Sequence, residues 1–107
     1  MIGIIGGMGP MATIKFCKEI LKLSNVCKDQ NNIPLLIYND SRIPDRTESI
    51  FNNDNKVKKY LINIAKKLEK NKCNQIVMPC NTAHYWAKDI EKSVNIPFIN
   101  MIDETML

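Results

Sequence analysis

IGIIGGMGP, residues 2–10, is an apolar run that ends in closely spaced glycines and a proline. The apolar run is typical of a short buried strand, and Pro10 suits the first turn of a helix because its missing N–H would have no intrahelical partner there. Apolar residues then recur at helical spacing until about Ser24. The stretch therefore predicts a strand, a glycine turn and a helix, which is the opening unit of an α/β fold.

The remainder of the chain repeats this alternation. Further strands are expected at Pro34–Tyr38, Gln75–Met78 and Ile96–Asn100, and further helices at Val57–Leu68 and from Ala83 to about Ser93. A polar loop from Asn39 to about Asn55 separates the second strand from the second helix. The order βαβαβαβ predicts a single α/β domain over residues 1–107, with a four-stranded, parallel, doubly wound sheet in the order 2-1-3-4.

This topology covers the two faces of the sheet unequally. Right-handed crossovers place the first helix on one face and the other two helices on the opposite face. Because parallel sheets normally bury both faces, a single helix over four strands leaves one face incompletely covered. We expect a further segment or a partner to fill this gap, and Asp103-Glu104-Thr105 could cap such an additional helix.

The composition narrows the class of protein. The 107 residues, of which 45% are apolar, fit one core, and no apolar run approaches the roughly 18–20 residues of a membrane span. No basic segment precedes the apolar residues of Met1–Ile5, so we expect a cytoplasmic protein without a signal peptide.

The net charge is +4, but the lysines are spread over helix faces without interleaved aromatics, which argues against a nucleic-acid partner. The four cysteines form no C-x-x-C pair, so neither a disulfide framework nor a metal site is expected.

Three segments should meet at the ligand-binding edge of this sheet, beyond the carboxyl ends of the strands. They are Gly6–Pro10, Asn39–Thr47 and Pro79–His84. The glycine turn offers backbone N–H groups to an anion at a helix N-terminus, or simply allows close packing of helix and strand. Residues 7–12 also fit G-x-G-x-x-A, a dinucleotide-binding pattern, although its ribose-binding acid would have to be Asp40, later than that pattern expects.

Two arginines lie in the second segment. Arg42 and Arg46 can each present a planar fork to a carboxylate, which lysine cannot match. A surface salt bridge within a polar loop is the alternative explanation for them.

Cys80 is the cysteine that this arrangement favours for chemistry. It directly follows the third strand and precedes a helix, whose N–H groups can stabilise a thiolate. His84, four residues later, allows a cysteine–histidine pair for acyl transfer, or serves as a structural hydrogen-bond partner. Asn81 and Thr82 can cap the helix. Structural roles are expected for Cys17, on the apolar stripe of the first helix, and for Cys27 and Cys73, at the opposite edge of the sheet.

Taken together, three motifs resemble those of the aspartate/glutamate racemase family, in particular its aspartate racemase branch. The motifs are Ile4-Ile5-Gly6-Gly7-Met8-Gly9-Pro10, Ile43-Pro44-Asp45-Arg46-Thr47 and Pro79-Cys80-Asn81-Thr82-Ala83-His84. The resemblance extends over nearly the whole chain, and it includes Asn95-Ile96-Pro97 and Asn100-Met101-Ile102, which look like the family's approach to its domain boundary.

The resemblance implies a cofactor-independent, PLP-independent isomerase in which two similar α/β domains close over an amino acid. Each domain contributes one cysteine, one removing the Cα proton and the other returning a proton from the opposite face. Cys80 matches the first cysteine. Arg46, with Asp45 beside it, would hold the carboxylates of the substrate, and the other matched positions around Cys80 are Met8, Asn81 and Thr82.

Family members are about twice as long, and their second cysteine lies in a glycine-cysteine-threonine-glutamate segment that this chain lacks. Residues 1–107 are therefore expected to correspond to the N-terminal half of an amino-acid racemase, without its second domain. The expected ligand is a small acidic amino acid such as aspartate, and the expected partner is a second copy of the chain or a complementing C-terminal half. Two alternatives remain, an inactive module that binds acidic amino acids and a dinucleotide-binding domain.

Overall fold

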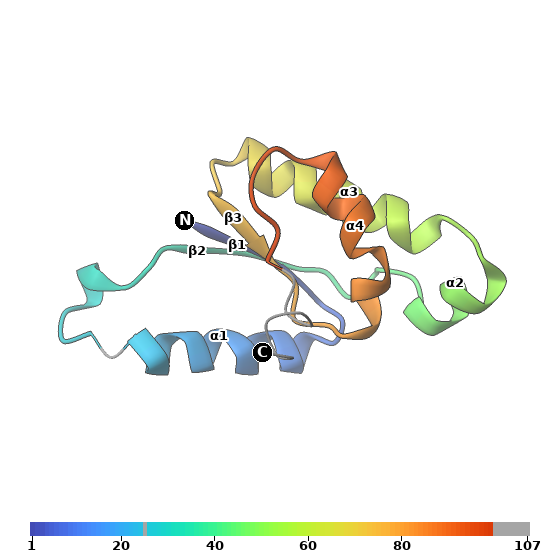
Figure 1. The fold of residues 1–107 in the computed structure, drawn as a ribbon. Helices are drawn as coiled ribbons and strands as arrows, with labels where there is room; N and C mark the ends of the chain where they lie inside the picture. The colour runs from blue at the N-terminus through green and yellow to red at the C-terminus, as the bar shows by residue number, and fades with distance from the viewer. Residues whose placement is uncertain (25, 100–107) are drawn as a thin grey trace.

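A parallel sheet of three strands organises the fold in the computed structural model, which describes residues 1–24 and 26–99. The strands are β1 (Ile2–Gly6), β2 (Leu35–Asn39) and β3 (Gln75–Val77), and their order is β2-β1-β3 (Figure 1). The α-helices are α1 (Pro10–Ser24), α2 (Arg46–Asn52), α3 (Lys56–Lys70) and α4 (Ala87–Ser93). Two short 3-10 helices, η1 (Asp29–Asn31) and η2 (Thr82–Trp86), complete the secondary structure of the described residues.

The predicted α/β class and the order of the first three strands are confirmed, but the predicted fourth strand is wrong. Where Ile96–Asn100 was expected to pair along β3, Phe98 makes a single parallel bridge to Ile76. The Ile76 N–H donates to the carbonyl oxygen of Pro97 and the Ile99 N–H donates to that of Ile76, each over 2.9 Å. Pairing stays short because β3 itself has three residues and Pro97 has no N–H to donate. Asn100, the last residue of the expected strand, lies outside the described residues.

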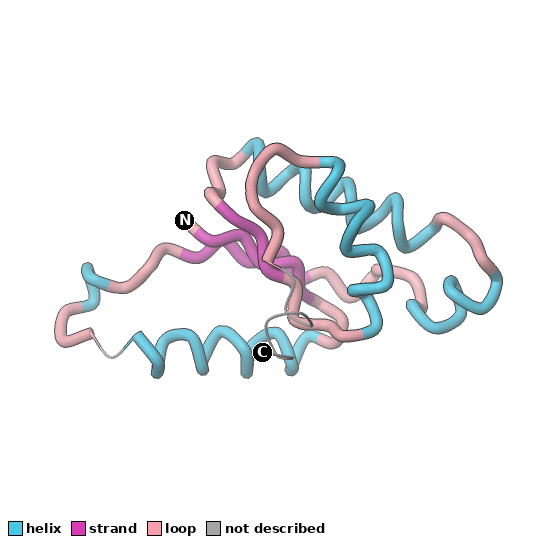
Figure 2. Tube along the Cα trace, viewed as in Figure 1, coloured by secondary structure: helices cyan, strands magenta, loops and turns pink. Residues whose placement is uncertain are grey.

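The main core lies between the sheet and the layer formed by α3 and α4. Figure 2 shows these two helices on one side of the strands and α1 on the other, as the right-handed crossovers predict. The α3 helix is amphipathic, and its apolar stripe packs against the sheet while its lysines face outward. Its fully or almost fully buried residues are Val57, Leu61, Ile64, Ala65 and Leu68.

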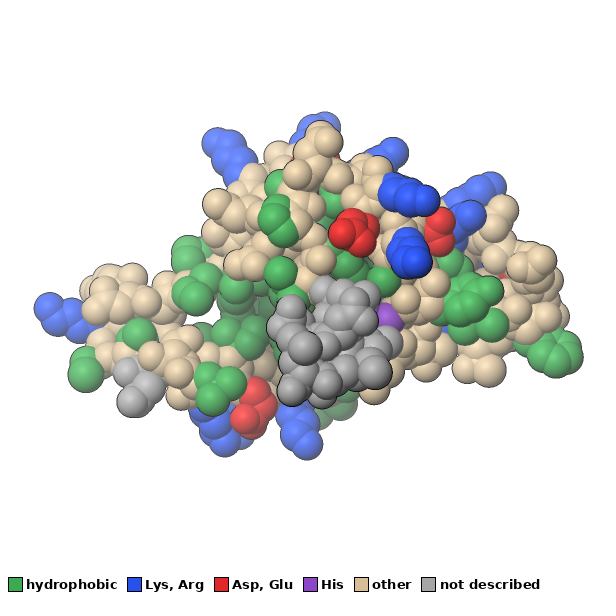
Figure 3. Space-filling view, in the orientation of Figure 1, with side chains coloured by type: hydrophobic (Ala, Val, Ile, Leu, Met, Phe, Trp, Pro, Cys, Tyr) green, Lys and Arg blue, Asp and Glu red, His purple; other side chains and the backbone are tan. Residues whose placement is uncertain are grey.

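The opposite face of the sheet is incompletely covered, as predicted. Only Thr13 and Cys17 of α1 are buried, and Ile37 of β2, which does not join its neighbours Leu36 and Tyr38 against the main core, is 43% exposed. Figure 3 shows apolar side chains around a hollow between α1 and the rest of the molecule. What fills this side stays a prediction, and the helix start expected at Asp103–Thr105 lies outside the described residues.

Two segments differ from their predicted secondary structure. The segment from Asn39 to Asn55 was expected to be a loop, but it contains α2, which begins where the Asp45 side chain accepts a hydrogen bond from the Glu48 N–H. The third expected helix is divided into η2 and α4. Within the described residues, no helix combines the length and apolarity needed to cross a membrane.

Candidate functional site

The two strand registers bring the three predicted segments to the same edge of the sheet. Ile2 pairs with Leu35 of β2 and with Gln75 of β3, and both pairings run in parallel toward the glycine turn. The Asp40 backbone continues the pairing of β2 with β1 and lies against Gly7, and Cys80 follows the end of β3 at the same edge. The candidate site therefore has the glycine turn at its centre, with the end of β2 on one side and the end of β3 on the other.

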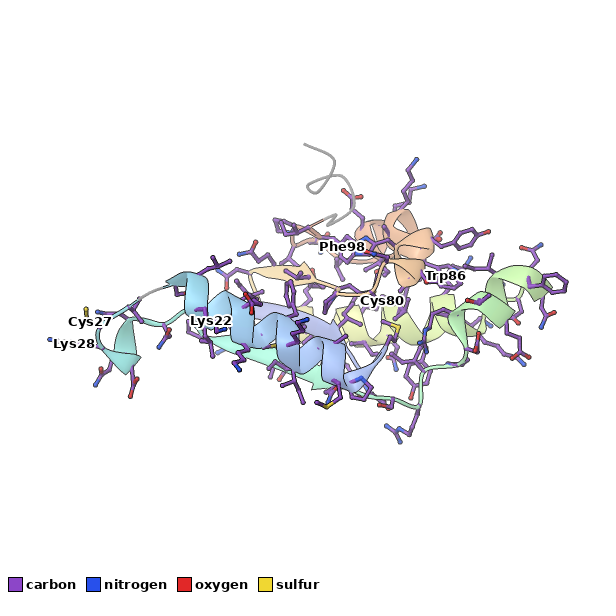
Figure 4. All side chains as sticks on the ribbon, turned by 90° about the horizontal axis from the view of Figure 1, so that it is seen from below. Lys22, Cys27, Lys28, Cys80, Trp86 and Phe98 are labelled. Atoms are coloured by element: carbon purple, nitrogen blue, oxygen red, sulfur yellow. The ribbon has the colours of Figure 1, made fainter. Side chains whose placement is uncertain are left out.

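Cys80 is fixed by the carbonyl group of Met78. The Cys80 N–H donates to this carbonyl oxygen over 2.9 Å, and the His84 Nε2–H donates to it over 2.8 Å. Cys80 itself is half-buried at the margin of the core, and Figure 4 shows it on the same side of the molecule as Trp86 and Phe98.

His84 has a structural role in this loop. Its ring is buried, lies 5.8 Å from the Phe98 ring between centroids, and holds the turn through Nε2. Among the described residues its Nδ1 has no hydrogen-bond partner. Because Nε2 is already committed to a carbonyl oxygen, the arrangement favours the structural alternative for His84 over a cysteine–histidine pair for acyl transfer.

The other three cysteines are remote from this edge or buried. Cys17 and Cys73 are buried, and their burial raises the pKa of both thiols, which disfavours the thiolate. Cys27 is exposed, but Figure 4 shows it at one end of the molecule, well away from Cys80 near the middle. Cys80 is therefore the one cysteine of the described residues that lies at the carboxyl ends of the strands.

The structure distinguishes the two arginines. The Arg42 side chain is 80% exposed and binds the Asp40 carboxylate through two parallel hydrogen bonds of 2.9 Å each, from Nε and from a terminal nitrogen. These bonds, the Arg42 backbone N–H and the Tyr60 hydroxyl hold the pKa of Asp40 well below its ordinary value. The salt-bridge explanation is thus correct for Arg42, because its guanidinium group is already bound to the Asp40 carboxylate.

Arg46 is the arginine that remains free to bind an anion. It is half-buried at the first position of α2 and has no carboxylate partner among the described residues. Asp45, in contrast, is occupied as the N-cap of α2, where it accepts the Glu48 N–H over 2.8 Å. Its expected role beside a substrate stays a prediction.

The glycine turn is held from both sides. Gly7 has a φ of 103°, and a Cβ there would collide with the backbone of Asp40. The Gly7 N–H donates to the Thr13 Oγ1 over 3.0 Å, and that hydroxyl donates to the Gly9 carbonyl oxygen over 3.2 Å. One of the N–H groups expected to face an anion is therefore already used. The Met8 side chain packs into the core, so this residue can reach a ligand only through its backbone.

Asn81 and Thr82 are exposed at the start of η2. The Asn81 side chain makes no capping hydrogen bond, so the capping alternative is wrong for this residue. A groove of about 360 Å³ reaches this point between α1 and the end of β3, and its walls include Ala12, Phe16, Pro79 and Asn81. Asn81 therefore has a polar side chain free to contact a small ligand.

Other ligand classes receive little support from this geometry. The carboxylate of Asp40, which a dinucleotide would need for its ribose, is already bound by Arg42 and Tyr60. Within residues 1–24 and 26–99, no three His, Cys, Asp or Glu side chains are grouped so that they could hold a metal ion.

Comparison with known proteins decides the family. Residues 5–107 match the family described as Asp/Glu/hydantoin racemase. The chain belongs to this family. It is 33% identical over 110 residues to the broad-specificity amino-acid racemase RacX of Bacillus subtilis (strain 168), an alignment that covers 99% of this chain and 48% of RacX.

Two solved structures agree with this membership. The aspartate racemase of Picrophilus torridus is 42% identical, with a TM-score of 0.87 over 97% of this chain and 44% of that chain. An aspartate racemase homologue from Pyrococcus horikoshii OT3 is 33% identical, with a TM-score of 0.75 over 95% of this chain and 45% of that chain. The chain thus spans about half the length of the relatives that it matches.

The partners of Asp40 were not predicted from the sequence. In the sequence Asp40 suggested only a ribose ligand, whereas in the structure it contacts Arg42, Tyr60 and the glycine turn. The spacing of Asp40 and Arg42 was a usable signal, because side chains two residues apart after a strand can pair within one turn. The hydrogen bond from Tyr60 could not be predicted in this way, because the spacing of apolar residues in α3 does not show which loop its hydroxyl contacts.

Proposed function

We propose that this chain forms one half of the active site of a cofactor-independent amino-acid racemase that acts on an acidic amino acid such as aspartate. The observation that carries the proposal is the position of Cys80. It is the one described cysteine at the carboxyl ends of the strands, just beyond β3, which pairs with β1 ahead of the glycine turn, and it is only half-buried. Membership of the racemase family and the relatives' racemase activity support the same reading.

In the proposed reaction, the Cys80 thiolate removes the proton from Cα of the amino acid. The C–H bond breaks, an S–H bond forms, and the electron pair left on Cα is delocalised into the adjacent carboxylate. An acid on the opposite face then donates a proton to Cα and gives the other enantiomer. Only Cys80 is proposed for this chemistry within these 107 residues, so the second acid must come from outside them, for example from a second copy or a complementing half.

Arg46 is the proposed partner of a substrate carboxylate. Its guanidinium is free of carboxylates among the described residues and can form two parallel hydrogen bonds with one. Neutralising a carboxylate next to Cα also favours the carbanion, because less negative charge accumulates there when the proton leaves. Asn81, Thr82, Asp45 and the backbone of Met8 are the further proposed contacts.

Proton NMR of L-aspartate in heavy water tests the proposal. The wild-type chain is expected to cause loss of the Cα proton signal, and chiral analysis then reports whether the exchange inverts the centre. Cys80→Ala should abolish the exchange. Cys27→Ala is the matched control, because Cys27 is exposed at the far end of the molecule, and it should retain the exchange. Exchange that survives Cys80→Ala, or no exchange by the folded wild-type chain, would contradict the proposal.

A second candidate is a module that binds an acidic amino acid without converting it. The free guanidinium of Arg46 favours this candidate, because it has no carboxylate partner among the described residues and can hold an acidic amino acid whether or not Cys80 reacts. Calorimetry distinguishes the two functions. A binding module should retain L-aspartate binding in Cys80→Ser and lose it in Arg46→Ala, while Lys28→Ala, which removes an exposed cation far from Cys80, should bind normally.

A further inference from the structure

Asp40 is a buried, ionised side chain to which the proposed reaction gives no role. The residue is 8% exposed. Its carboxylate accepts four hydrogen bonds, three from the side chain and backbone of Arg42 at 2.9 Å each and one from the Tyr60 hydroxyl at 3.0 Å. A buried carboxylate that accepts charge-assisted bonds from this many donors has one strongly preferred position.

The backbone of Asp40 packs closely against Gly7. The Asp40 N–H donates to the Gly6 carbonyl oxygen over 3.3 Å, which continues the pairing of β2 with β1 by one residue. A Cβ on Gly7 would stand 2.6 Å from the Asp40 nitrogen and nearer still to the Asp40 carbonyl. Any displacement of Asp40 toward the turn must therefore move Gly7 as well.

The side chain of Asp40 also connects the glycine turn to the main core. Tyr60 lies on α3, the helix that buries its whole apolar stripe against the sheet. The contacts thus run from α3 through the Tyr60 hydroxyl to Asp40, and from the Asp40 backbone to Gly7. Gly7 follows β1, and Cys80 follows β3, the strand paired in parallel with β1, so both residues lie beyond the same edge of the sheet.

We propose that Asp40 is a positioning residue, held by Tyr60 and Arg42, which fixes the glycine turn beside Cys80. The part of this inference that concerns ligand binding rests on the proposed function, because it takes Cys80 and the adjacent turn as the place where the amino acid binds. Asp40 itself does not touch the substrate in this arrangement, because its carboxylate is fully engaged.

Tyr60→Phe and Asp40→Asn test the inference, with Tyr38→Phe as the matched control. Tyr38 is also half-buried next to α3, but its hydroxyl accepts from Lys67 and not from the Asp40 group. Tyr60→Phe removes only the hydroxyl, so it remains informative if Asp40→Asn fails to fold. The first readout is the set of backbone amide resonances of Gly7 and Met8, measured without ligand and well below the melting temperature.

The amides of Gly7 and Met8 should shift in Tyr60→Phe and in Asp40→Asn, and should stay in place in Tyr38→Phe. A shifted turn should also change the alkylation rate of Cys80, a measurement that needs no ligand. It should weaken L-aspartate binding about tenfold, which corresponds to about 1.4 kcal/mol.

Unmoved Gly7 and Met8 amides in both variants would overturn the inference whether or not aspartate binds. Moved amides with an unchanged Cys80 alkylation rate would also overturn it, because they would show a structural role alone. Failure of the wild-type chain to bind aspartate counts instead against the proposed function, and the amide and alkylation readouts still decide the role of Asp40.

Discussion

The Tyr60 hydroxyl donates a 3.0 Å hydrogen bond to the carboxylate of Asp40, 20 residues earlier in the chain. This bond joins α3 to the end of β2 at the level of the glycine turn. It also affects both ionisation equilibria. The carboxylate keeps its charge more readily, while burial, followed by the contact with Asp40, raises the pKa of Tyr60. The stability of the protein should therefore depend on the pH through the ionisation of this pair.

Asp40→Asn should lower the melting temperature at neutral pH. Because the pKa of Asp40 is depressed in the folded state, its contribution to stability is complete above its ordinary pKa of 3.8 and is lost as the pH falls below that value. The difference in melting temperature between wild type and Asp40→Asn should therefore narrow between about pH 5 and pH 2. Circular dichroism melts across this range measure it, and a constant difference would contradict the explanation.

Gly7→Ala should destabilise the fold by about 1–3 kcal/mol, because the alanine would be forced to a positive φ and its Cβ against the Asp40 backbone. Gly9→Ala is the matched control, since a Cβ there meets no atom within 4 Å. It should change the free energy of unfolding by less than about 0.5 kcal/mol. Urea unfolding curves compare the two variants, and equal effects would show that the Gly7 contact is unimportant.

Asp45→Ala should cost about 1 kcal/mol of stability through loss of the α2 N-cap. Asp45→Asn should retain almost all of that stability, because asparagine is an equally good N-cap. The same pair of variants separates capping from ligand binding. If Asp45 acts only as the cap, Asp45→Asn binds L-aspartate as the wild type does, whereas a direct role in binding would weaken the asparagine variant as well.

The four cysteines should react with iodoacetamide at clearly different rates. Cys27 is exposed and should react first, and the half-buried Cys80 should follow. Cys17 and Cys73 should be slower by about tenfold or more, because burial both blocks access and raises their pKa. Mass spectrometry of the peptides gives the individual rates. In concentrated urea the four rates should converge, and rapid native-state labelling of Cys17 or Cys73 would contradict their burial.

The elements that the sequence predicted well are those with strong local signals. The strand, glycine turn and helix at residues 2–24 were recognised from the glycine cluster, Pro10 and helical spacing, and α3 from its apolar stripe. For β1 and α3, the apolar residues that identify the element in the sequence are also the residues that it buries in the core. The convergence of Gly7, Asp40 and Cys80 on one edge followed from topology, because parallel strands end at the same side of a sheet.

The missed features depend on weak or non-local signals. The α2 helix is short, and its start was signalled only by the spacing of Asp45 and Glu48, which matches a capping pattern. The prediction of a fourth strand was wrong because β-propensity does not show how many backbone hydrogen bonds a segment forms with its neighbour. That number depends on how the tertiary structure places the segment, and here Phe98 makes only one bridge to β3. The choice between Arg42 and Arg46 required the position of Asp40, since both arginines have the same chemistry.

The thin attachment of α1 has a consequence for hydrogen exchange. This helix contributes two buried residues, whereas α3 buries five, so its local opening requires far less free energy than the opening of α3. Its amide hydrogens should exchange with solvent early, as a separate unit from the sheet. Thr13 opens together with that unit, and its hold on Gly7 and Gly9 opens with it. During such openings Gly7 keeps its contact with the Asp40 backbone, whereas Gly9 loses its hydrogen bond from Thr13.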